Sequence, residues 1–231
     1  MNNYITKIFN PTYLCLLWRS PKEKEGFFAI AKIERKSNGS IIFYYLKDTE
    51  DYKNAQNRGF DGYSAFPEKD KIYTTNVLEL FMRRLPPKKR EDFKFYLNQL
   101  GLDQNIEIPD FALLGYSGAQ LATDDFKLVY TFDNLEVPCE VVMGAVGVRH
   151  CLKDMSVLQL NERVNFVPDP TNIHDPNAII IEYRGDKIGY VSRVQSESFL
   201  KILKIYNVSA LIQKINGTEK RPKIWVKVSI S

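Results

Sequence analysis

Residues 168–177 hold a high density of side chains that can form hydrogen bonds, in a segment with prolines at positions 168, 170 and 176. Proline fixes its own φ and restricts the residue before it to extended conformations, so the sequence predicts a locally rigid loop. Binding residues are concentrated on loops held by a rigid scaffold. We therefore expect a binding loop, and the alternative is a turn that only connects two strands. The hydrogen-bonding groups that we expect this loop to present are those of Asn172, His174, Asp175 and Asn177.

Two short strands follow the loop and would hold it in place. Residues 178–181 are apolar, and residues 187–191 form a second strand after a tight turn at 184–186. Short apolar runs bounded by turn residues are typical of strands. This unit would place the loop at the mouth of a small sheet.

Further short elements surround this unit in the C-terminal part of the chain. An apolar run at 139–148 ends in Arg149 and His150, and residues 158–167 alternate as a strand would. A helix is expected over 192–203 because its apolar residues recur at helical spacing. Short strands with one helix predict a small, partly closed β-barrel of the OB or SH3 kind. The remaining expected elements are strands at 208–215 and 224–230, joined by a turn that opens at Asn216-Gly217.

The N-terminal part has a mixed pattern of strands and helices. An apolar run at 13–18 and strands at 27–34 and 41–46 are expected, and a glycine- and aromatic-rich stretch at 59–67 predicts an ordered loop. Helices are expected over 76–84 and 88–100, with Gly101 as a C-cap. Asp133, Asn134 and Pro138 punctuate the chain after these elements. The sequence thus predicts an α+β protein with a mixed α/β domain at 1–134 and a barrel domain at 135–231.

Composition is that of a protein able to bury a core. Of the 231 residues, 44% are hydrophobic and 26% are charged, the balance of a globular chain. No apolar run reaches the roughly 18 residues of a membrane span. The first residues lack the layout of a signal peptide, and three scattered cysteines fit a reducing compartment. We therefore expect a cytoplasmic protein.

The excess positive charge lies in the C-terminal part of the chain. Residues 140–231 carry 13 Lys/Arg and 9 Asp/Glu, a net charge of +4, and the remaining 19 basic and 19 acidic residues cancel. Modest local basicity is typical of a surface that meets phosphate, and the alternative is an ordinary solvated surface. A basic cluster at 83–90 allows the same two interpretations.

The chain lacks the usual signatures of a hydrolase. Gly115-Tyr-Ser-Gly-Ala119 approaches the nucleophile-elbow pattern, but Ala119 stands where the pattern needs glycine and no histidine lies in this half. A hydrolase acting through Ser117 is therefore not favoured, and a glycine-shaped turn is the preferred interpretation. No glycine-rich phosphate-binding loop is present either.

A metal site is not favoured by the spacing of its possible ligands. Cys139, His150, Cys151 and His174 do not form a Cys-x-x-Cys or His-x-x-x-His pattern. On the expected strand, His150 and Cys151 would point apart. His174 with Asp175 could form an acid–base pair, but no nucleophile or metal completes it. We therefore expect no metal, no cofactor and no enzymatic activity.

Four pieces of the C-terminal part recur together in one known family. They are Val-Gly-Val-Arg-His at 146–150, Leu-Asn-Glu-Arg-Val at 160–164, the loop and strand at 168–179, and Gly-Asp-Lys-Ile-Gly-Tyr-Val-Ser-Arg at 185–193. In order and spacing, residues 137–231 resemble a HIRAN domain. The resemblance implies an OB-like fold that binds single-stranded DNA at a free 3′ end. HIRAN domains occur alone in bacteria and fused to remodelling helicases in eukaryotes.

The resemblance also implies a role for each matching residue. Arg149 would grip phosphate and His150 would support a base, although a tyrosine is commoner at the positions of both His150 and His174. Asp175 would accept a hydrogen bond from the terminal 3′-hydroxyl, so that a 3′-phosphate or a continuing strand is excluded. Backbone amides near Ala178 would add neutral donors. The complete implied DNA-binding set is Arg149, His150, Asn172, His174, Asp175, Asn177, Ala178, Tyr190 and Arg193.

A weaker resemblance concerns residues 14–100. Phe-Ala-Ile-Ala-Lys-Ile at 28–33, Ser-Ile-Ile-Phe-Tyr-Tyr at 40–45 and Phe-Met-Arg-Arg-Leu-Pro at 81–86 are similar to the small N-terminal subdomain of HipA-type toxin kinases. The catalytic part of such kinases has no counterpart here. This likeness implies an interaction or regulatory module. The competing functional hypothesis is thus an accessory subunit that binds a protein partner in a HipA-type toxin–antitoxin or phage-defence complex.

Overall fold

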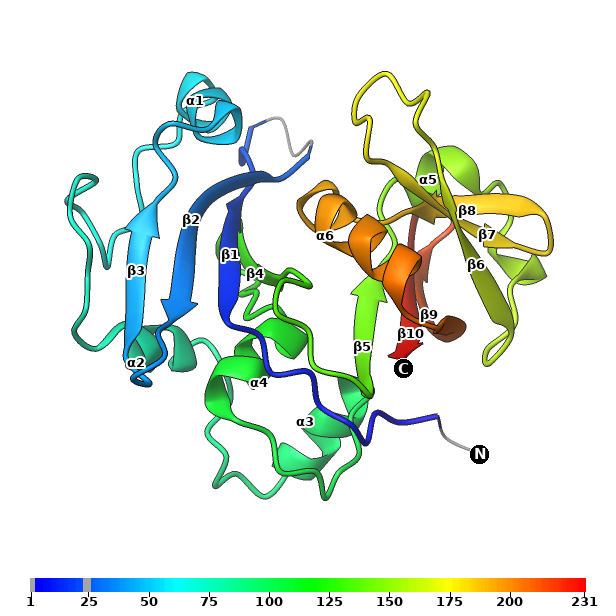
Figure 1. Ribbon diagram of the computed structural model, residues 1–231, viewed down its shortest axis with the longest axis horizontal. Coiled ribbons are helices and arrows are strands. Elements are labelled where there is room, and N and C mark those ends of the chain that lie inside the picture. The colour runs from blue at the N-terminus through cyan, green and yellow to red at the C-terminus, as the bar shows by residue number, and fades with distance from the viewer. Residues whose placement is uncertain (1–2, 23–25) are drawn as a thin grey trace. The chain divides into compact units, whose positions relative to one another are not determined.

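The computed structural model describes residues 3–22 and 26–231, which form two compact units. The N-terminal unit comprises residues 10–93 and 108–134, and the C-terminal unit comprises residues 3–9, 94–107 and 135–231. Each unit contains one sheet, and strands and helices are mixed along the chain (Figure 1).

The N-terminal unit is built on a four-stranded antiparallel sheet of order β3-β2-β1-β4. Three of its strands lie within a residue or two of the expected ranges: β1 (Tyr13–Trp18), β2 (Phe28–Arg35) and β3 (Ile41–Tyr45). The fourth, β4 (Phe126–Tyr130), pairs with β1 although more than a hundred residues separate them. Only tertiary pairing could reveal this strand.

Helices α1 (Glu50–Asn57), α2 (Val77–Met82) and α4 (Asp110–Ser117) complete this unit. The sequence predicted only α2 of these three helices. Helix α1 is short and buries just two side chains, and α4 is apolar on nearly every side and so has no distinct apolar face. Residues 115–119 are therefore the end of a helix and not only a turn. Ser117 donates its hydroxyl to the Leu114 carbonyl at 3.2 Å and accepts from the Ala119 amide at 3.2 Å.

Aromatic side chains fill the core of the N-terminal unit. Phe43 stacks on Phe66 with ring centroids 4.2 Å apart, and Tyr63 stacks on Phe81 at 5.5 Å. The loop at 59–67 is ordered because the Tyr45 hydroxyl donates to the Phe66 carbonyl and accepts from the Tyr63 amide.

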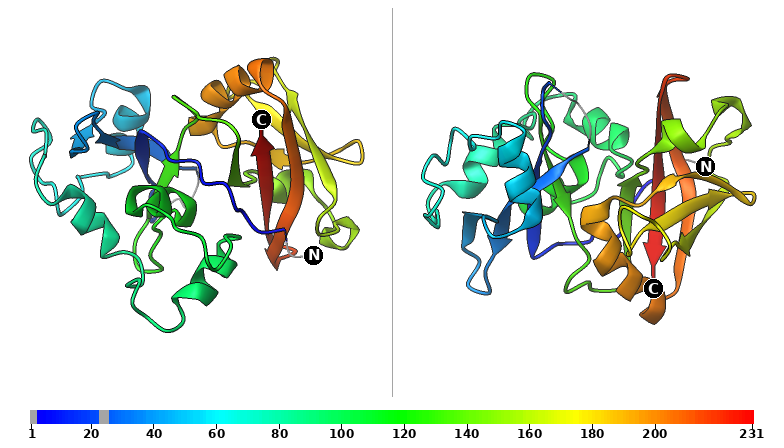
Figure 2. Two further views of the ribbon diagram at one scale, coloured as in Figure 1. Left: turned by 60° about the horizontal axis from the view of Figure 1, so that its bottom comes forward. Right: turned by 90° about the horizontal axis from the view of Figure 1, so that it is seen from above.

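The C-terminal unit contains a six-stranded sheet that curls strongly. Its strand order is β5-β10-β9-β6-β7-β8, and β6 pairs with β9 through its first residues and with β7 through its last. The long strands β9 and β10 therefore cross β7 and β8 at a steep angle (Figure 2). The strands are β5 (Cys139–Gly144), β6 (Arg163–Pro168), β7 (Ile179–Tyr183), β8 (Asp186–Tyr190), β9 (Val208–Thr218) and β10 (Arg221–Ile230).

The two edges of this sheet meet just beyond β5. Val146 and Tyr190 exchange two backbone hydrogen bonds, of 2.8 and 2.9 Å. The sheet is thus the partly closed barrel that the sequence predicts, and α6 (Arg193–Ile205) is its principal helix. Phe199 and Ile202 of α6 are buried.

Three local predictions for this unit are wrong. The apolar run at 139–148 is not one strand: β5 ends at Gly144, and residues 148–151 form the short helix α5 (Val148–Cys151) after Gly147 at φ 71°. His150 and Cys151 therefore lie on a helical turn and not on a strand. The 3-10 helix η1 (Met155–Val157) is followed by a turn with Asn161 at φ 66°, and the strand expected at 158–167 begins only at Arg163. The turn between β9 and β10 is formed by residues 219–220 and not by Asn216-Gly217.

Residues 3–9 and 94–107 pack on the outer side of this sheet. The Ile5 amide donates to the Gly101 carbonyl at 2.8 Å, and the Glu140 amide donates to the Lys7 carbonyl at 2.9 Å. Lys227 of β10 forms an ion pair with Glu140 at 2.6 Å and donates to the Tyr4 carbonyl. A buried pair of charges therefore fastens the first residues of the chain to the C-terminal sheet. Helix α3 (Phe93–Gln99) precedes Gly101 and begins five residues later than predicted.

Candidate nucleic-acid interface

Tyr190 lies at the centre of the residues that the sequence singled out. On one side its backbone pairs with Val146, which leads into α5 and Arg149. On the other side it pairs with Ile180, at the start of the strand that follows the 169–178 loop. Three residues later, α6 begins at Arg193. The fold therefore brings together segments that are separated by more than forty residues in the sequence.

A bulge in β8 gives Tyr190 a cationic neighbour. Ile181 opposes Gly189 and Glu182 opposes Lys187, so Ile188 is the extra residue on β8. Residues three apart on a regular strand point to opposite faces, and the bulge places Lys187 and Tyr190 on the same side. The Lys187 amine donates to the Tyr190 hydroxyl at 3.0 Å, and this hydrogen bond raises the pKa of Lys187 above its usual value.

Asp169 connects Tyr190 to the loop. Its Oδ2 accepts from the side-chain amide of Asn172 at 3.3 Å and from the Tyr190 hydroxyl at 3.4 Å. Its Oδ1 accepts from the Thr171 hydroxyl at 3.1 Å. The hydrogen bond from Asn172 is the main cause of the lowered pKa of Asp169. Both carboxylate oxygens of Asp169 are thus engaged in holding the loop.

The loop satisfies several of its own backbone amides. The Asn172 side chain accepts from the His174 amide at 3.0 Å, and the Ala178 amide donates to the Asp175 carbonyl at 3.0 Å. Backbone amides near Ala178 were expected to add neutral donors, and the Ala178 amide itself is already used within the loop. Ala178 itself is 5% exposed.

Asp175 has one engaged and one available carboxylate oxygen. Its Oδ1 accepts from the Asn177 amide at 2.9 Å. Among the described residues, no donor reaches its Oδ2. Asp175 and Asn177 are both half-buried, whereas His174 is exposed. Of the two carboxylates in this region, Asp175 is therefore the one that can accept a further hydrogen bond.

Arg149 and His150 are exposed on α5. The Arg149 Nε donates to the His150 Nε2 at 2.9 Å. Two glycines allow the segment before α5 to approach β8 closely. A Cβ at Gly189 would lie only 3.0 Å from the Val146 carbonyl oxygen, and Gly147 has a positive φ next to the Tyr190 ring.

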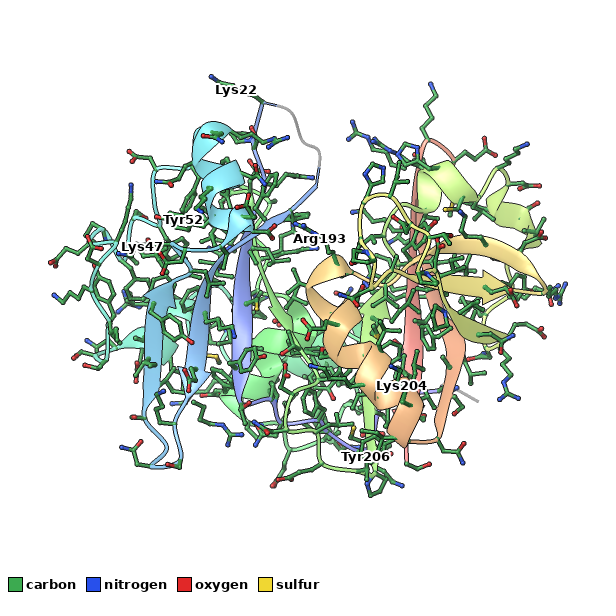
Figure 3. The ribbon with its side chains drawn as sticks, turned by 45° about the horizontal axis from the view of Figure 1, so that its top comes forward. Lys22, Lys47, Tyr52, Arg193, Lys204 and Tyr206 are labelled. Atoms are coloured by element: carbon green, nitrogen blue, oxygen red, sulfur yellow. The ribbon has the colours of Figure 1, made fainter. Side chains whose placement is uncertain are left out.

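Arg193 occupies the first turn of α6 and is exposed. Figure 3 labels Arg193 at this end of the helix and Lys204 near the other end. The Val191 amide donates to the Ile179 carbonyl at 2.9 Å, so the start of α6 follows directly from the paired ends of β7 and β8.

Three residues of this region were missed by sequence reasoning. Asp169 and Lys187 were not singled out as site residues. Ile173 is 91% exposed, the highest fraction among the large apolar side chains of the described residues. An isoleucine between two polar residues at the tip of a rigid loop was the available signal.

The described residues contain no cluster of three or more His, Cys, Asp and Glu side chains arranged to hold a metal ion. In the same part of the chain, no helix is both long and apolar enough to cross a membrane.

A comparison with models of known protein families finds one match, and the matched region contains all nine predicted site residues. Residues 140–231 match the HIRAN domain. No curated protein matches the chain. The matched region does not include the N-terminal part, so its likeness to HipA-type kinases, and the protein partner inferred from that likeness, stay predictions.

Two solved structures resemble part of the chain. One is the crystal structure of the HIRAN domain of human HLTF, with 19% identity, a TM-score of 0.33, and coverage of 39% of this chain and 74% of that chain. The other is the crystal structure of a protein from Lactobacillus plantarum, with 16% identity, a TM-score of 0.32, and coverage of 39% of this chain and 92% of that chain.

Proposed function

We propose that the C-terminal unit binds the free 3′ end of single-stranded DNA and performs no catalysis. The observation that carries this proposal is the convergence of Arg149, the 169–178 loop and Arg193 on Tyr190, within a region that matches the HIRAN domain. A function in DNA repair, DNA processing or defence would use such a module to detect strand ends.

Phosphate recognition is assigned to the cations around Tyr190. Arg149 and Lys187 are exposed and lie on the two elements that meet at the Val146–Tyr190 bridge. Arginine suits bidentate recognition of phosphate, and lysine acts as a compact point charge. Binding should therefore weaken as salt increases, because each phosphate contact releases counterions.

Recognition of the terminal hydroxyl is assigned to Asp175. A carboxylate oxygen accepts a hydrogen bond from a hydroxyl and repels the negative charge of a phosphate. Asp169 is less suited to this role because Asn172, Thr171 and Tyr190 already occupy its oxygens. The available Oδ2 of Asp175 is the feature that supports the assignment.

Contact with the bases is assigned to exposed rings and one apolar side chain. His150 and His174 are exposed, and Ile173 stands between Asn172 and His174 at the loop tip. Bases stack on aromatic faces without strong sequence preference. Imidazole offers a smaller face than the tyrosine ring, so we expect modest affinity with little base preference.

The test compares oligonucleotides that end in a 3′-hydroxyl or a 3′-phosphate. Fluorescence anisotropy across a series of salt concentrations should give tighter binding to the hydroxyl end. Asp175→Asn keeps an oxygen that can accept from the Asn177 amide but replaces Oδ2 with an amide donor. We expect it to weaken binding to the hydroxyl end about tenfold, the scale of a hydrogen bond to a charged group, and to narrow the discrimination.

Asp186→Asn is the matched control, since it removes the same charge from the exposed first residue of β8. It should leave both affinities unchanged. Equal and negligible binding of the two oligonucleotides by the unmodified protein would refute the proposal. Cleavage or shortening of the bound strand during prolonged incubation would refute its non-catalytic part.

A further inference from the structure

The hairpin between β9 and β10 carries a group of cations that the fold does not use. Lys220, Arg221 and Lys223 are all exposed. Within the described part of the chain, none of these three side chains has an ion-pair or hydrogen-bond partner. Glu219 is the only acidic residue between positions 198 and 231. The positive charge of this hairpin is therefore not neutralised by neighbouring carboxylates.

The hairpin holds these cations on a regular backbone. Thr218 pairs with Arg221 across a two-residue turn, and Gly217 has φ 89°. A Cβ at Gly217 would collide with the Arg221 carbonyl oxygen, so only glycine fits this close approach. Arg221 and Lys223 are two residues apart and share one face of β10, while the intervening Pro222 is buried.

The hairpin begins where the candidate interface ends. Trp225 pairs with Gly144, the last residue of β5, and the Ala145 amide donates to the Ile224 carbonyl at 2.9 Å. The next residues of the chain form α5, which contacts both β8 and β10. The helix that carries Arg149 thus contacts both the strand that ends in Tyr190 and the strand that begins with the hairpin cations.

Lys214 does not belong to this group of cations. Its amine lies 5.3 Å from the centre of the Trp225 ring and donates to the Gln99 carbonyl at 3.3 Å. It therefore helps to attach residues 94–107 to the sheet, whereas the three hairpin cations have no such structural task.

We infer that Lys220, Arg221 and Lys223 form a track for the phosphodiester backbone of the strand on the 5′ side of the bound end. This inference rests on the proposed function, because a strand whose 3′ end is bound near Tyr190 extends away from the site with the nucleotides on the 5′ side of that end. Proteins that bind single strands combine an end or base contact with a basic surface along the backbone. The cations next to α5 offer the required charge.

The test measures how affinity depends on strand length. A trinucleotide and an oligonucleotide of about twelve nucleotides, both with a 3′-hydroxyl, are compared for the unmodified protein and Arg221→Gln/Lys223→Gln. The double variant should bind the longer strand about tenfold more weakly at ~0.1 M salt and bind the trinucleotide unchanged. Each contact with a single strand contributes about 0.7 to the slope of log K against log salt, so the slope for the longer strand should fall by about 1.4.

Lys201→Gln/Lys204→Gln is the control with the same loss of charge. These lysines lie in the last turns of α6, roughly 12–17 Å along the helix from Arg193 at 1.5 Å per residue. This variant should bind both strands like the unmodified protein. Thermal melting of both variants checks that the unit remains folded.

Three results would overturn the track: no gain in affinity with length for the unmodified protein, equal effects of the two double variants, or an equal loss for both strand lengths with Arg221→Gln/Lys223→Gln. The end-binding proposal is read from a different quantity, the preference for a 3′-hydroxyl over a 3′-phosphate. A loss of that preference with the length effect intact would refute end recognition and leave the track standing.

Discussion

The two units use their cations differently. In the N-terminal unit, nine basic side chains form ion pairs with carboxylates among the described residues, for example Arg19 with Asp125 and Arg84 with Asp124. In the basic cluster at 83–90, three of the five cations, Arg84, Lys88 and Arg90, are paired in this way. In the C-terminal unit, Lys227 forms an ion pair with Glu140 inside the fold. Among the described residues, Lys220, Arg221 and Lys223 have no such partner. The other N-terminal pairs are Lys36–Glu34, Lys47–Asp70, Lys53–Glu50, Lys69–Asp61, Lys71–Glu68, Lys88–Asp110 and Arg90–Asp92.

This difference explains why net charge alone was a weak guide. A paired cation contributes little field beyond its partner, whereas an unpaired cation on a regular hairpin attracts phosphate. The net charge of +4 in residues 140–231 became informative only when the structure separated the paired side chains from the unpaired ones. Charge used for folding and charge available for a ligand should respond differently to substitution.

The largest effect is expected for Lys227→Met. The side chains of Lys227 and Glu140 are 7% and 14% exposed, and removing one partner of a buried pair typically costs about 3–5 kcal/mol. The C-terminal unit should lose stability by about that amount. Urea unfolding in a Trp18→Phe background measures it, since Trp225 is then the one tryptophan left and reports on this unit.

A loss below about 1 kcal/mol, the scale of a surface pair, would contradict the structural use of Lys227. Lys223→Met on the same strand is the control. It removes an exposed, unpaired charge and should leave the free energy of unfolding nearly unchanged.

The next largest effect is expected for Arg84→Met in the N-terminal unit. The Arg84 guanidinium forms two hydrogen bonds with Asp124 and donates to the Ala119 carbonyl, and its side chain is 7% exposed. Since Asp124 is 26% exposed and remains partly hydrated, the cost should be smaller, about 2–3 kcal/mol. Trp18 fluorescence in a Trp225→Phe background reports this unit. An unchanged unfolding midpoint would show that the pair is dispensable.

A moderate effect is expected from acid. Burial raises the pKa of Glu140, but hydrogen bonds from Lys227 and from the Thr6 and Lys7 amides outweigh it, and the net pKa is lowered. A lowered folded pKa stabilises the fold above the unfolded value of about 4.3, and this stability is lost as pH falls through the folded pKa. The loss is at most about 1.4 kcal/mol per pH unit for one proton.

Glu140→Gln separates this contribution from the other carboxylates. The variant should be less stable at neutral pH and should lose less stability between about pH 5 and pH 3 than the unmodified protein. If the free energy of unfolding falls equally with pH in the two proteins, Glu140 is not the group that causes the loss of stability in acid.

The smallest effect is expected for Lys201→Gln. Lys201 forms an exposed pair with Glu197 one helical turn away on α6, and such pairs contribute about 0.3–0.5 kcal/mol. Stability should change by no more than that, and oligonucleotide binding should not change. A substantial loss of DNA affinity would mean that the binding surface extends along α6, which would weaken the contrast between used and unused charge.

Much of the C-terminal fold follows from local patterns. Short apolar runs bounded by turn residues located β7 and β8, and helical spacing located α6, because these signals depend on neighbours a few residues apart. The same logic failed at α5, where the apolar run 145–148 looks like the continuation of β5. There the chain must turn so that Val146 can pair with Tyr190. No pattern of neighbouring residues predicts a contact between segments so far apart in the sequence.

The division of labour between two carboxylates shows the same limit. Asp169 and Asp175 lie in one proline-braced loop, and the sequence alone offered only Asp175 as a ligand-binding group. The structure gives Asp169 the task of joining the loop to Tyr190. It also leaves one oxygen of Asp175 without a donor among the described residues.

The sequence by itself singled out the polar residues of the 168–177 loop, predicted that this loop is rigid and indicated the kind of sheet that carries it, whereas the resemblance to a known family supplied the other candidate residues. Side-chain chemistry, proline restriction and hydrophobic periodicity are properties of short segments, so they are readable without the fold. Only the tertiary structure decided which charges are paired, which amides are already used, and that residues 3–9 pack against β5 and β10. Those outcomes depend on which distant groups meet, because a hydrogen bond or ion pair forms only at close range and consumes both partners.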